Sequence, residues 1–393
     1  MTKLTRASVA LVAGLAIFAA GCSKDDAADT TATTEVTTEA AAEGTEAAAT
    51  EAAADTVAAT EAAADTVAAA AAAGGKAGFI LPDSKSSARW EAFDRKYITE
   101  ACLAAGIECD IQNAEGDKAK MATIADGMMA AGVKVLALVN LDSPSAVAIQ
   151  EKAAAAGVKL IDYDRLTLGG KTDVYVSFDN VAVGKAQGEG LIKCLGDTAG
   201  KKIIQLHGSP TDNNATLFKQ GYQEAIKSSG LETVGEEAVP DWDNQKGGQI
   251  FEQLLTKAGG KIDGVLVAND GLSLAAQAVL EKAGLTVPTT GQDATPDGLA
   301  AVLKGTQCMT VYKSVKIEAN AAVAAAVGLL KGADPATLGN ATINDGARDL
   351  PYSQAPITPI FKDNVKVVTD DGFVTKEELC KGDIAALCTE AGI

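Results

Sequence analysis

From Gly78 onward the chain repeats one unit: a short apolar run, a cluster of polar residues, and a longer stretch with helical spacing. Several helical stretches end in glycine, as at Ala105-Gly106 and Ala156-Gly157, which is a common signal for a helix C-terminus. Alternating strands and helices of this length predict right-handed βαβ units and a mostly parallel sheet. The units are too many for one small sheet, so the pattern predicts two α/β lobes.

The apolar runs predict strands at residues 79–81, 107–111, 135–139, 159–161, 174–177, 203–206, 265–268, 286–287 and 309–311. The helical spacing predicts helices at residues 88–105, 119–131, 145–156, 182–195, 215–228, 245–258, 272–283 and 315–330. The last helix follows Lys313 directly, which indicates that the chain returns there to the first lobe.

Polar clusters follow many of the predicted strands, at residues 83–90, 162–165, 209–214, 269–270, 291–293 and 312–313. In an open parallel sheet, ligands bind beyond the carboxyl ends of the strands, where these clusters would lie. Carboxylates and guanidinium groups can each engage two neighbouring hydroxyls, and an indole offers a flat apolar face. This chemistry suits a neutral, polyhydroxylated ring better than it suits a reaction.

Several of these polar positions also have a simpler structural interpretation. The two tryptophans of the chain are Trp90 and Trp242. Trp242 stands between two aspartates, which favours ligand contact over the core, whereas Trp90 could equally begin the first helix. Among residues 212–214, one side chain could cap the following helix while another faces the ligand. Asp164-Arg165 could be a surface ion pair, and Lys313 a solvated lysine.

The first 22 residues have the pattern of an export signal. Lys3 and Arg6 form a charged start, residues 7–20 an apolar core, and residues 19–21 a small-residue cleavage region. The core is too short for a membrane-spanning helix, which needs about 20 apolar residues. Cys22 directly after small residues is similar to a bacterial lipobox, which predicts a signal peptide at 1–21 and a lipid on Cys22. The alternative is an ordinary signal peptide that leaves Cys22 as a free thiol.

Residues 22–75 predict an acidic, low-complexity tether. The ten-residue sequence TEAAADTVAA occurs twice in succession, at 50–59 and 60–69. Large apolar side chains are almost absent, so the segment cannot bury enough surface to offset its ordering entropy. The tether carries much of the net charge of −18, and this acidic balance argues against nucleic acid as a partner.

The six cysteines that follow Cys22 suggest disulfides in an exported protein. Cys102 and Cys109 bracket a helix-to-strand turn and form the first expected pair. Cys380 could pair with Cys388, or either could reach Cys194 or Cys308. No CxxC motif occurs and the chain has a single histidine, His207, so neither a metal site nor a cofactor is expected.

Taken together, these segments resemble the periplasmic sugar-binding proteins of ABC transporters, and among them those that bind D-xylose. The resemblance covers about residues 76–373. KSSARW at 85–90 is instead similar to the multiple-sugar-binding members of the family. The other stretches that carry the resemblance are YDR at 163–165, VSFDN at 176–180, GSPTDNNATLF at 208–218, GQDA at 291–294 and GTQCMTVYK at 305–313.

The resemblance implies a type I periplasmic-binding fold, in which two Rossmann-like lobes with parallel sheets are joined by a three-strand hinge. Residues 76–178 and 314–343 would form the N-terminal lobe, and residues 179–313 and 344–393 the C-terminal lobe. The hinge strands are expected near residues 178–180, 313–314 and 344–348. The implied ligand contacts are Arg89, Trp90, Asp164, Arg165, Asp212, Asn214, Trp242, Asn269, Asp293 and Lys313, with Lys85 as an additional contact.

Two departures from the xylose-binding pattern leave the sugar open. The sequence VPDWDNQ lacks a glycine before Trp242, and the segment before Arg89 has the longer KSSA version. The tail beyond Phe373 matches nothing in the family.

The implied function is that of a monomeric, lipid-anchored extracytoplasmic protein that captures a monosaccharide, D-xylose or a similar aldose, for an ABC permease. An alternative is a sensor whose sugar-bound form contacts a chemoreceptor or a sensor kinase. An enzyme is disfavoured, because the chain has no nucleophile elbow, phosphate loop or metal motif. In addition, nothing marks Asp164 or Asp293 as a proton donor.

Overall fold

The computed structural model describes residues 75–393. The predicted signal peptide, Cys22 and the tether up to residue 74 lie outside the described residues. Within residues 75–393, no helix is long and apolar enough to cross a membrane.

A seven-stranded sheet forms the centre of what we call the first lobe. Its strand order is β10-β11-β5-β4-β3-β1-β2, and every neighbouring pair is parallel except β10 with β11. β1, β3 and β5 are buried along almost their whole length, which explains the continuous apolar runs in the sequence. The strands are β1 (Lys76–Leu81), β2 (Glu108–Asn113), β3 (Val135–Leu138), β4 (Lys159–Tyr163), β5 (Val174–Phe178), β10 (Ala341–Asn344) and β11 (Asp349–Ala355).

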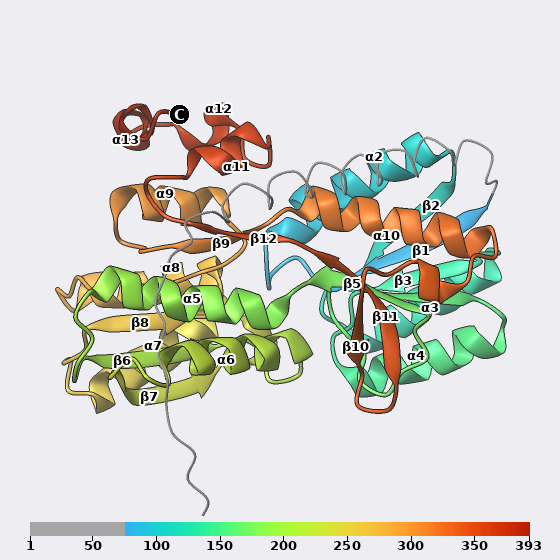
Figure 1. The fold of residues 1–393 in the computed structure, drawn as a ribbon. Coiled ribbons are helices and arrows are strands. Elements are labelled where there is room, and N and C mark those ends of the chain that lie inside the picture. Colours follow the sequence, from blue (N-terminus) through green and yellow to red (C-terminus); the bar gives the residue numbers. More distant parts are fainter. Residues whose placement is uncertain (1–74) are drawn as a thin grey trace, which may run out of the picture. The chain divides into compact units, whose positions relative to one another are not determined.

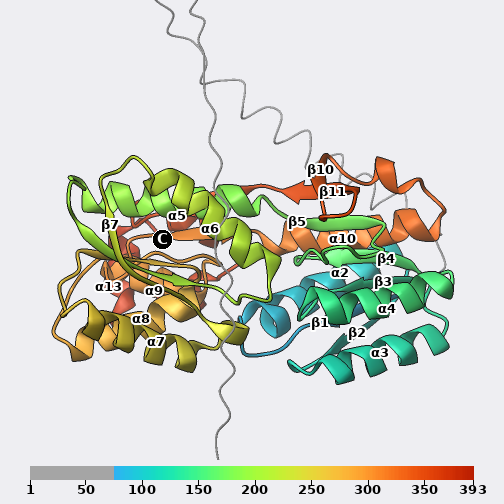
Figure 2. The ribbon, with the colours of Figure 1, turned by 90° about the horizontal axis from the view of Figure 1, so that it is seen from below.

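Helices cover both faces of this sheet (Figure 2). α3 (Lys118–Ala130) and α4 (Ser143–Ala155) bury their apolar side chains against β1, β3 and β4 on one face. α2 (Arg95–Ala105) and α10 (Val315–Leu330) pack on the opposite face. α2 is preceded by a single π-helical turn at Trp90–Asp94.

The second lobe contains a three-stranded parallel sheet in the order β7-β6-β8. Isolated bridges at Thr289 and Gln292 continue this surface toward β9, which pairs antiparallel with β12. The strands are β6 (Lys202–His207), β7 (Glu232–Ala238), β8 (Gly264–Val267), β9 (Thr310–Lys313) and β12 (Ile357–Ile360). The helices are α5 (Asn180–Leu195), α6 (Asn213–Ile226), α7 (Asn244–Lys257), α8 (Asp270–Lys282) and α9 (Pro296–Lys304).

Helices α5 and α6 approach each other closely because glycines line their contact. A Cβ atom on Gly184 would lie 2.0 Å from the carbonyl oxygen of Phe218, and one on Gly221 would lie 2.0 Å from that of Val181. Only glycine allows this spacing. The close contact fixes α6, whose N-terminus carries polar residues of the site described below.

The chain passes between the lobes three times, which agrees with the predicted three-strand hinge (Figure 1). The first two passages follow β5 and β9, as expected. The prediction that the third passage lies at residues 344–348 is wrong. Those residues form the turn of the β10–β11 hairpin, and β11 pairs with β5, so the chain leaves the first lobe only between Ala355 and Ile357. Residues 344–355 therefore belong to the first lobe and not to the second.

The disulfides pair Cys102 with Cys109, Cys194 with Cys308, and Cys380 with Cys388. The first pair confirms the expectation from the sequence. Among the alternatives left open for the tail, the structure has the local pair. The tail contains three short helices, α11 (Lys366–Asp370), α12 (Lys376–Leu379) and α13 (Ile384–Glu390), and this pair links the end of α12 to α13.

The C-terminal tail contacts both lobes. Phe373 packs on Phe93 of the first lobe, with ring centroids 4.3 Å apart, and on Tyr312 of the second lobe, at 5.3 Å. Lys304 of α9 forms an ion pair with Asp383 at 2.8 Å. The tail therefore adds an apolar connection between the lobes to the three covalent passages.

His207, the only histidine of the chain, is buried at the end of β6 between Tyr222 and Glu236. Burial lowers the pKa of His207 to about 4. The unfolded chain takes up this proton near pH 6.5 and the folded protein only near pH 4. The neutral histidine therefore stabilises the folded protein at pH 7. As the pH falls from 6.5 to 4, the free energy of unfolding decreases by about 3 kcal/mol.

We expect the single imidazole signal in an NMR pH titration to have its midpoint near pH 4. Urea denaturation of wild type and His207→Gln at pH 7 and pH 5 should show a smaller pH dependence in the variant. A midpoint near pH 6.5 would contradict the buried, neutral histidine.

Candidate ligand-binding site

Ten of the eleven residues predicted to contact a ligand line one narrow cavity, about 30 Å³ in volume, between the two lobes. All ten are buried. They lie at or beyond the ends of β4, β6, β8 and β9 and in the segments before α2, α7 and α9, which is the expected position for a parallel α/β fold. The lining residues are Ser86, Ser87, Arg89, Trp90, Asp164, Arg165, Asp212, Asn214, Phe218, Trp242, Asn269, Gln292, Asp293 and Lys313.

Arg89 is the centre of a buried ion cluster. Its Nε and Nη2 donate to the two oxygens of Asp94, at 2.9 and 2.8 Å. Nη1 donates to Asp164 Oδ2 at 2.8 Å, and Nη2 also contacts Glu318 of α10. A guanidinium group has five N–H donors, so these four bonds leave one for another partner.

Burial and the charges of this cluster shift the pKa values of its carboxyl groups. Burial by itself would raise the pKa of Asp164, but Arg89, Lys313 and Arg165 outweigh it and hold that pKa below its usual value. For Glu318 the balance is opposite: burial outweighs the attraction of Arg89 and raises its pKa well above the usual range. Of these two groups, Asp164 therefore gives up its proton more readily, and Glu318 retains its proton more readily.

The second lobe contributes an aspartate with two roles. Oδ1 of Asp212 accepts from the backbone N–H of Asn214 and caps α6, while Oδ2 accepts from the indole Nε1 of Trp242 at 3.0 Å. Arg165 of the first lobe lies 3.0 Å from the same Oδ2. Capping and facing the cavity, which the sequence presented as roles for two residues, are combined in one side chain.

Both tryptophans line the cavity and are held by hydrogen bonds. Trp90 begins the π-helical turn and donates to Ser86 Oγ at 3.0 Å, with the Arg89 guanidinium carbon 4.5 Å from its ring centroid. Trp242 has its ring edge against Gly208, where a Cβ atom would lie 2.0 Å from the indole. The missing glycine before Trp242 therefore does not keep the indole out of the cavity.

Polar contacts join the lobes across the cavity. Asn214 Nδ2 donates to the backbone oxygen of Asp164 at 2.9 Å, and Ser87 Oγ lies 3.4 Å from Asp293 Oδ2. Asp293 also forms an ion pair with Lys313 at 3.1 Å. Hydroxyl groups of a ligand could replace such contacts, because each polar group of the protein would then exchange a protein partner for a ligand partner.

Three of the lining residues adopt a left-handed backbone although none is glycine. The φ angles are 63° at Asp164, 55° at Trp242 and 95° at Asp293. Such conformations cost of order 1–3 kcal/mol each and occur preferentially at binding and catalytic sites. Here all three strained residues line the same cavity.

Lys85 does not line this cavity. Its side chain is exposed, and its backbone N–H donates to Asp83 Oδ1 at 2.7 Å. Asp83 folds the KSSA segment into a tight turn, which directs Ser86 and Ser87 inward in place of Lys85.

Sequence reasoning missed four lining residues and two buried partners of Arg89. The lining residues all belong to stretches that were already recognised: Ser86, Ser87, Phe218 and Gln292. Asp94 follows Arg89 by five residues and was within reach of a spacing argument. Glu318 lies far away in sequence, and no local signal indicates it.

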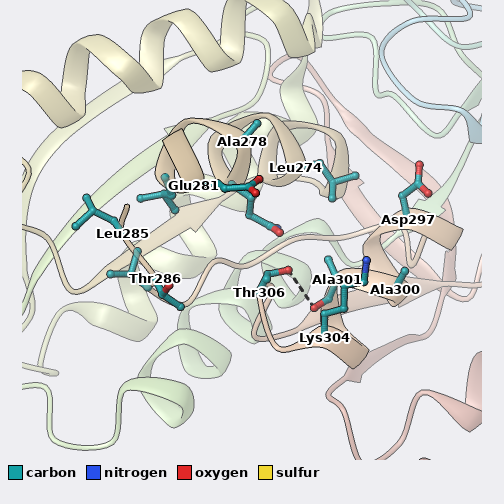
Figure 3. Close-up of a pocket in the computed structure, with 13 residues that line it drawn as sticks. Leu274, Ala278, Glu281, Leu285, Thr286, Asp297, Ala300, Ala301, Lys304 and Thr306 are labelled. Atoms are coloured by element: carbon teal, nitrogen blue, oxygen red, sulfur yellow. Dashed lines mark hydrogen bonds between the residues drawn. The ribbon is translucent and has the colours of Figure 1, made fainter. Parts of the chain in front are cut away.

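A larger groove, about 630 Å³, lies between α8 and α9 on the second lobe (Figure 3). Its lining mixes apolar side chains such as Leu274 and Leu285 with the charged Glu281, Asp297 and Lys304 at separate points. Nowhere in residues 75–393 do three or more His, Cys, Asp or Glu side chains gather to hold a metal ion.

Comparison with known proteins identifies the class. Residues 77–334, well over half of the chain, match the periplasmic binding protein domain family. The chain therefore belongs to the periplasmic binding protein family, and its two-lobed α/β fold with parallel sheets is that of type I members.

Three proteins illustrate what the chain is similar to. It is 32% identical over 311 residues to the D-xylose-binding periplasmic protein of Escherichia coli K12, covering 77% of this chain and 92% of that protein. It is 29% identical to the multiple sugar-binding periplasmic receptor ChvE of Rhizobium radiobacter, covering 78% and 92%. A carbohydrate transporter solute-binding protein from Chloroflexus aurantiacus, solved with D-glucose, has a TM-score of 0.71 at 28% identity, covering 78% and 98%.

We expect Arg89→Met to lower the free energy of unfolding by about 3–5 kcal/mol, because the change strands buried carboxylates without their cation. Urea denaturation followed by circular dichroism measures this loss. Lys185→Met, which removes one partner of an exposed i,i+4 ion pair on α5, should cost about 0–1 kcal/mol. Equal effects of the two substitutions would contradict the buried cluster.

Proposed function

We propose that the protein binds a neutral monosaccharide, D-xylose or a similar aldose, between its two lobes. The cavity composition carries this proposal: paired carboxylates and cations, amides, and two indoles. Pairing limits the net field that a charged ligand would feel, while charge-assisted hydrogen bonds to hydroxyls remain strong. The similarity to the D-xylose-binding protein and to the D-glucose complex supports the same ligand class.

We also infer binding without turnover. A glycosidase needs a carboxyl group that is free to give up a proton to the leaving group. Asp164 has a lowered pKa and accepts from Arg89. Burial raises the pKa of Asp212, but both of its oxygens are occupied by Asn214, Trp242 and Arg165. This arrangement supports holding a ligand rather than supplying a proton.

The captured sugar would be delivered to an ABC permease, with the protein acting as a monomer outside the cytoplasm. The similar periplasmic proteins support this location, and the similarity to a carbohydrate transporter solute-binding protein supports the transport role. We propose in addition that a lipid on Cys22 anchors the chain and that residues 23–75 form its tether; this rests on the sequence alone.

Isothermal titration and tryptophan fluorescence with D-xylose, D-glucose, D-galactose, L-arabinose and xylitol test the ligand. The protein for this experiment lacks residues 1–21 and carries Cys22→Ser. We expect one-to-one binding of at least one aldose with a change in emission, because both tryptophans line the cavity. No binding across this panel would reject the proposed function.

Asp293→Ala should weaken binding of that aldose roughly 10- to 100-fold, since a charged hydrogen bond is worth about 1.5–3 kcal/mol. Lys85→Ala serves as the control, because its side chain is exposed and does not line the cavity. The affinity of the Lys85→Ala variant should stay within about twofold of the wild-type affinity. The assignment fails if the Lys85 variant loses affinity and the Asp293 variant does not.

For the anchor, Cys22→Ser should move the protein from the membrane fraction of the producing bacterium to the soluble fraction. Labelling with radioactive palmitate should mark wild type but not the variant. An unlabelled, soluble wild-type protein with an intact Cys22 would show that the signal peptide is an ordinary one.

A further inference from the structure

One residue that lines the cavity has a buried polar atom without a partner among the described residues. Seven buried side-chain oxygen or nitrogen atoms of the described residues make no hydrogen bond, and only two of them belong to lining residues. One is Arg165 Nε, which lies 3.0 Å from Asp212 Oδ2, so that its charge is compensated. The other is the amide oxygen Oε1 of Gln292, and Gln292 is only 2% exposed.

The backbone of Gln292 is held by contacts with two neighbouring segments of the second lobe. Its carbonyl oxygen accepts from the backbone N–H of Asp270 at 3.1 Å, and the residue forms a parallel bridge with Val311. The next residue, Asp293, has the left-handed backbone described above. Gln292 therefore has a fixed place among the lining residues, and its amide oxygen has no partner within the described residues.

An unpaired buried oxygen costs stability, and such atoms are rare in folded proteins. We propose that Gln292 is an additional ligand residue whose Oε1 accepts a hydrogen bond from a hydroxyl group of the bound sugar. This assignment rests on the proposed function. A hydroxyl is the matching chemistry, because it donates to Gln292 while its oxygen still accepts from a cation such as Lys313.

Gln292→Met tests the proposal, because methionine has a similar length and no polar atom. We expect the melting temperature of the sugar-free protein to stay equal or rise, since the substitution removes an unpaired buried group. The affinity for D-xylose or D-glucose, measured by titration, should fall roughly tenfold. A merely structural glutamine would instead lower the melting temperature and leave the affinity of the folded protein within about twofold.

A matched control exists in Gln205 of β6, whose Oε1 is also buried and unpaired but does not line the cavity. Gln205→Met should leave the affinity unchanged, although it loses a hydrogen bond to Thr233 and some stability. An equal loss of affinity in both variants would overturn the assignment.

Monodeoxy forms of D-xylose and D-glucose give a second readout. Wild type and Gln292→Met should bind one of these monodeoxy sugars equally well, because that sugar lacks the hydroxyl group that donates to Gln292. If the ratio of the wild-type affinity to the Gln292→Met affinity is the same for every analogue, a direct contact is rejected. If wild type binds none of the five sugars of the panel above, the proposed function fails and this assignment with it; unchanged binding by the variant alone rejects only the assignment.

Discussion

The site depends on the buried pairing of Arg89 with carboxylates. A charge removed from water is stable only with an opposite charge and complete hydrogen bonding. Arg89 obtains this from Asp94 before α2, Asp164 after β4 and Glu318 in α10. One side chain thus joins the strand edge to two helices of the first lobe and holds Trp90 beside it.

The two lobes meet through chemically different surfaces. On the cavity side the contacts are polar, as between Asn214 and Asp164, and a hydroxylated ligand can replace them at small net cost. Beside the passages of the chain the contacts are apolar, with Phe373 of the tail between Phe93 and Tyr312. This division lets a ligand compete for one surface while the other maintains the connection between the lobes.

Much of the fold follows from local sequence. Helices α3, α4, α5 and α8 begin with an Asp or Asn cap, and the buried parallel strands appear as apolar runs. β7 was missed because it is an exposed edge strand, rich in glutamate and without apolar alternation. The β10–β11 hairpin was missed and the third passage was misplaced, because only pairing with β5 decides to which sheet those residues belong.

The sequence by itself determined which side chains gather at the strand ends, since residue type and spacing after each strand are local properties. The resemblance of these stretches to the sugar-binding family then implied the ten residues, from Arg89 to Lys313, that line the cavity. Only the tertiary structure placed Lys85 outside the cavity and brought Glu318 to Arg89. It alone left Gln292 Oε1 without a partner, because burial and hydrogen-bond satisfaction depend on contacts between segments far apart in the chain.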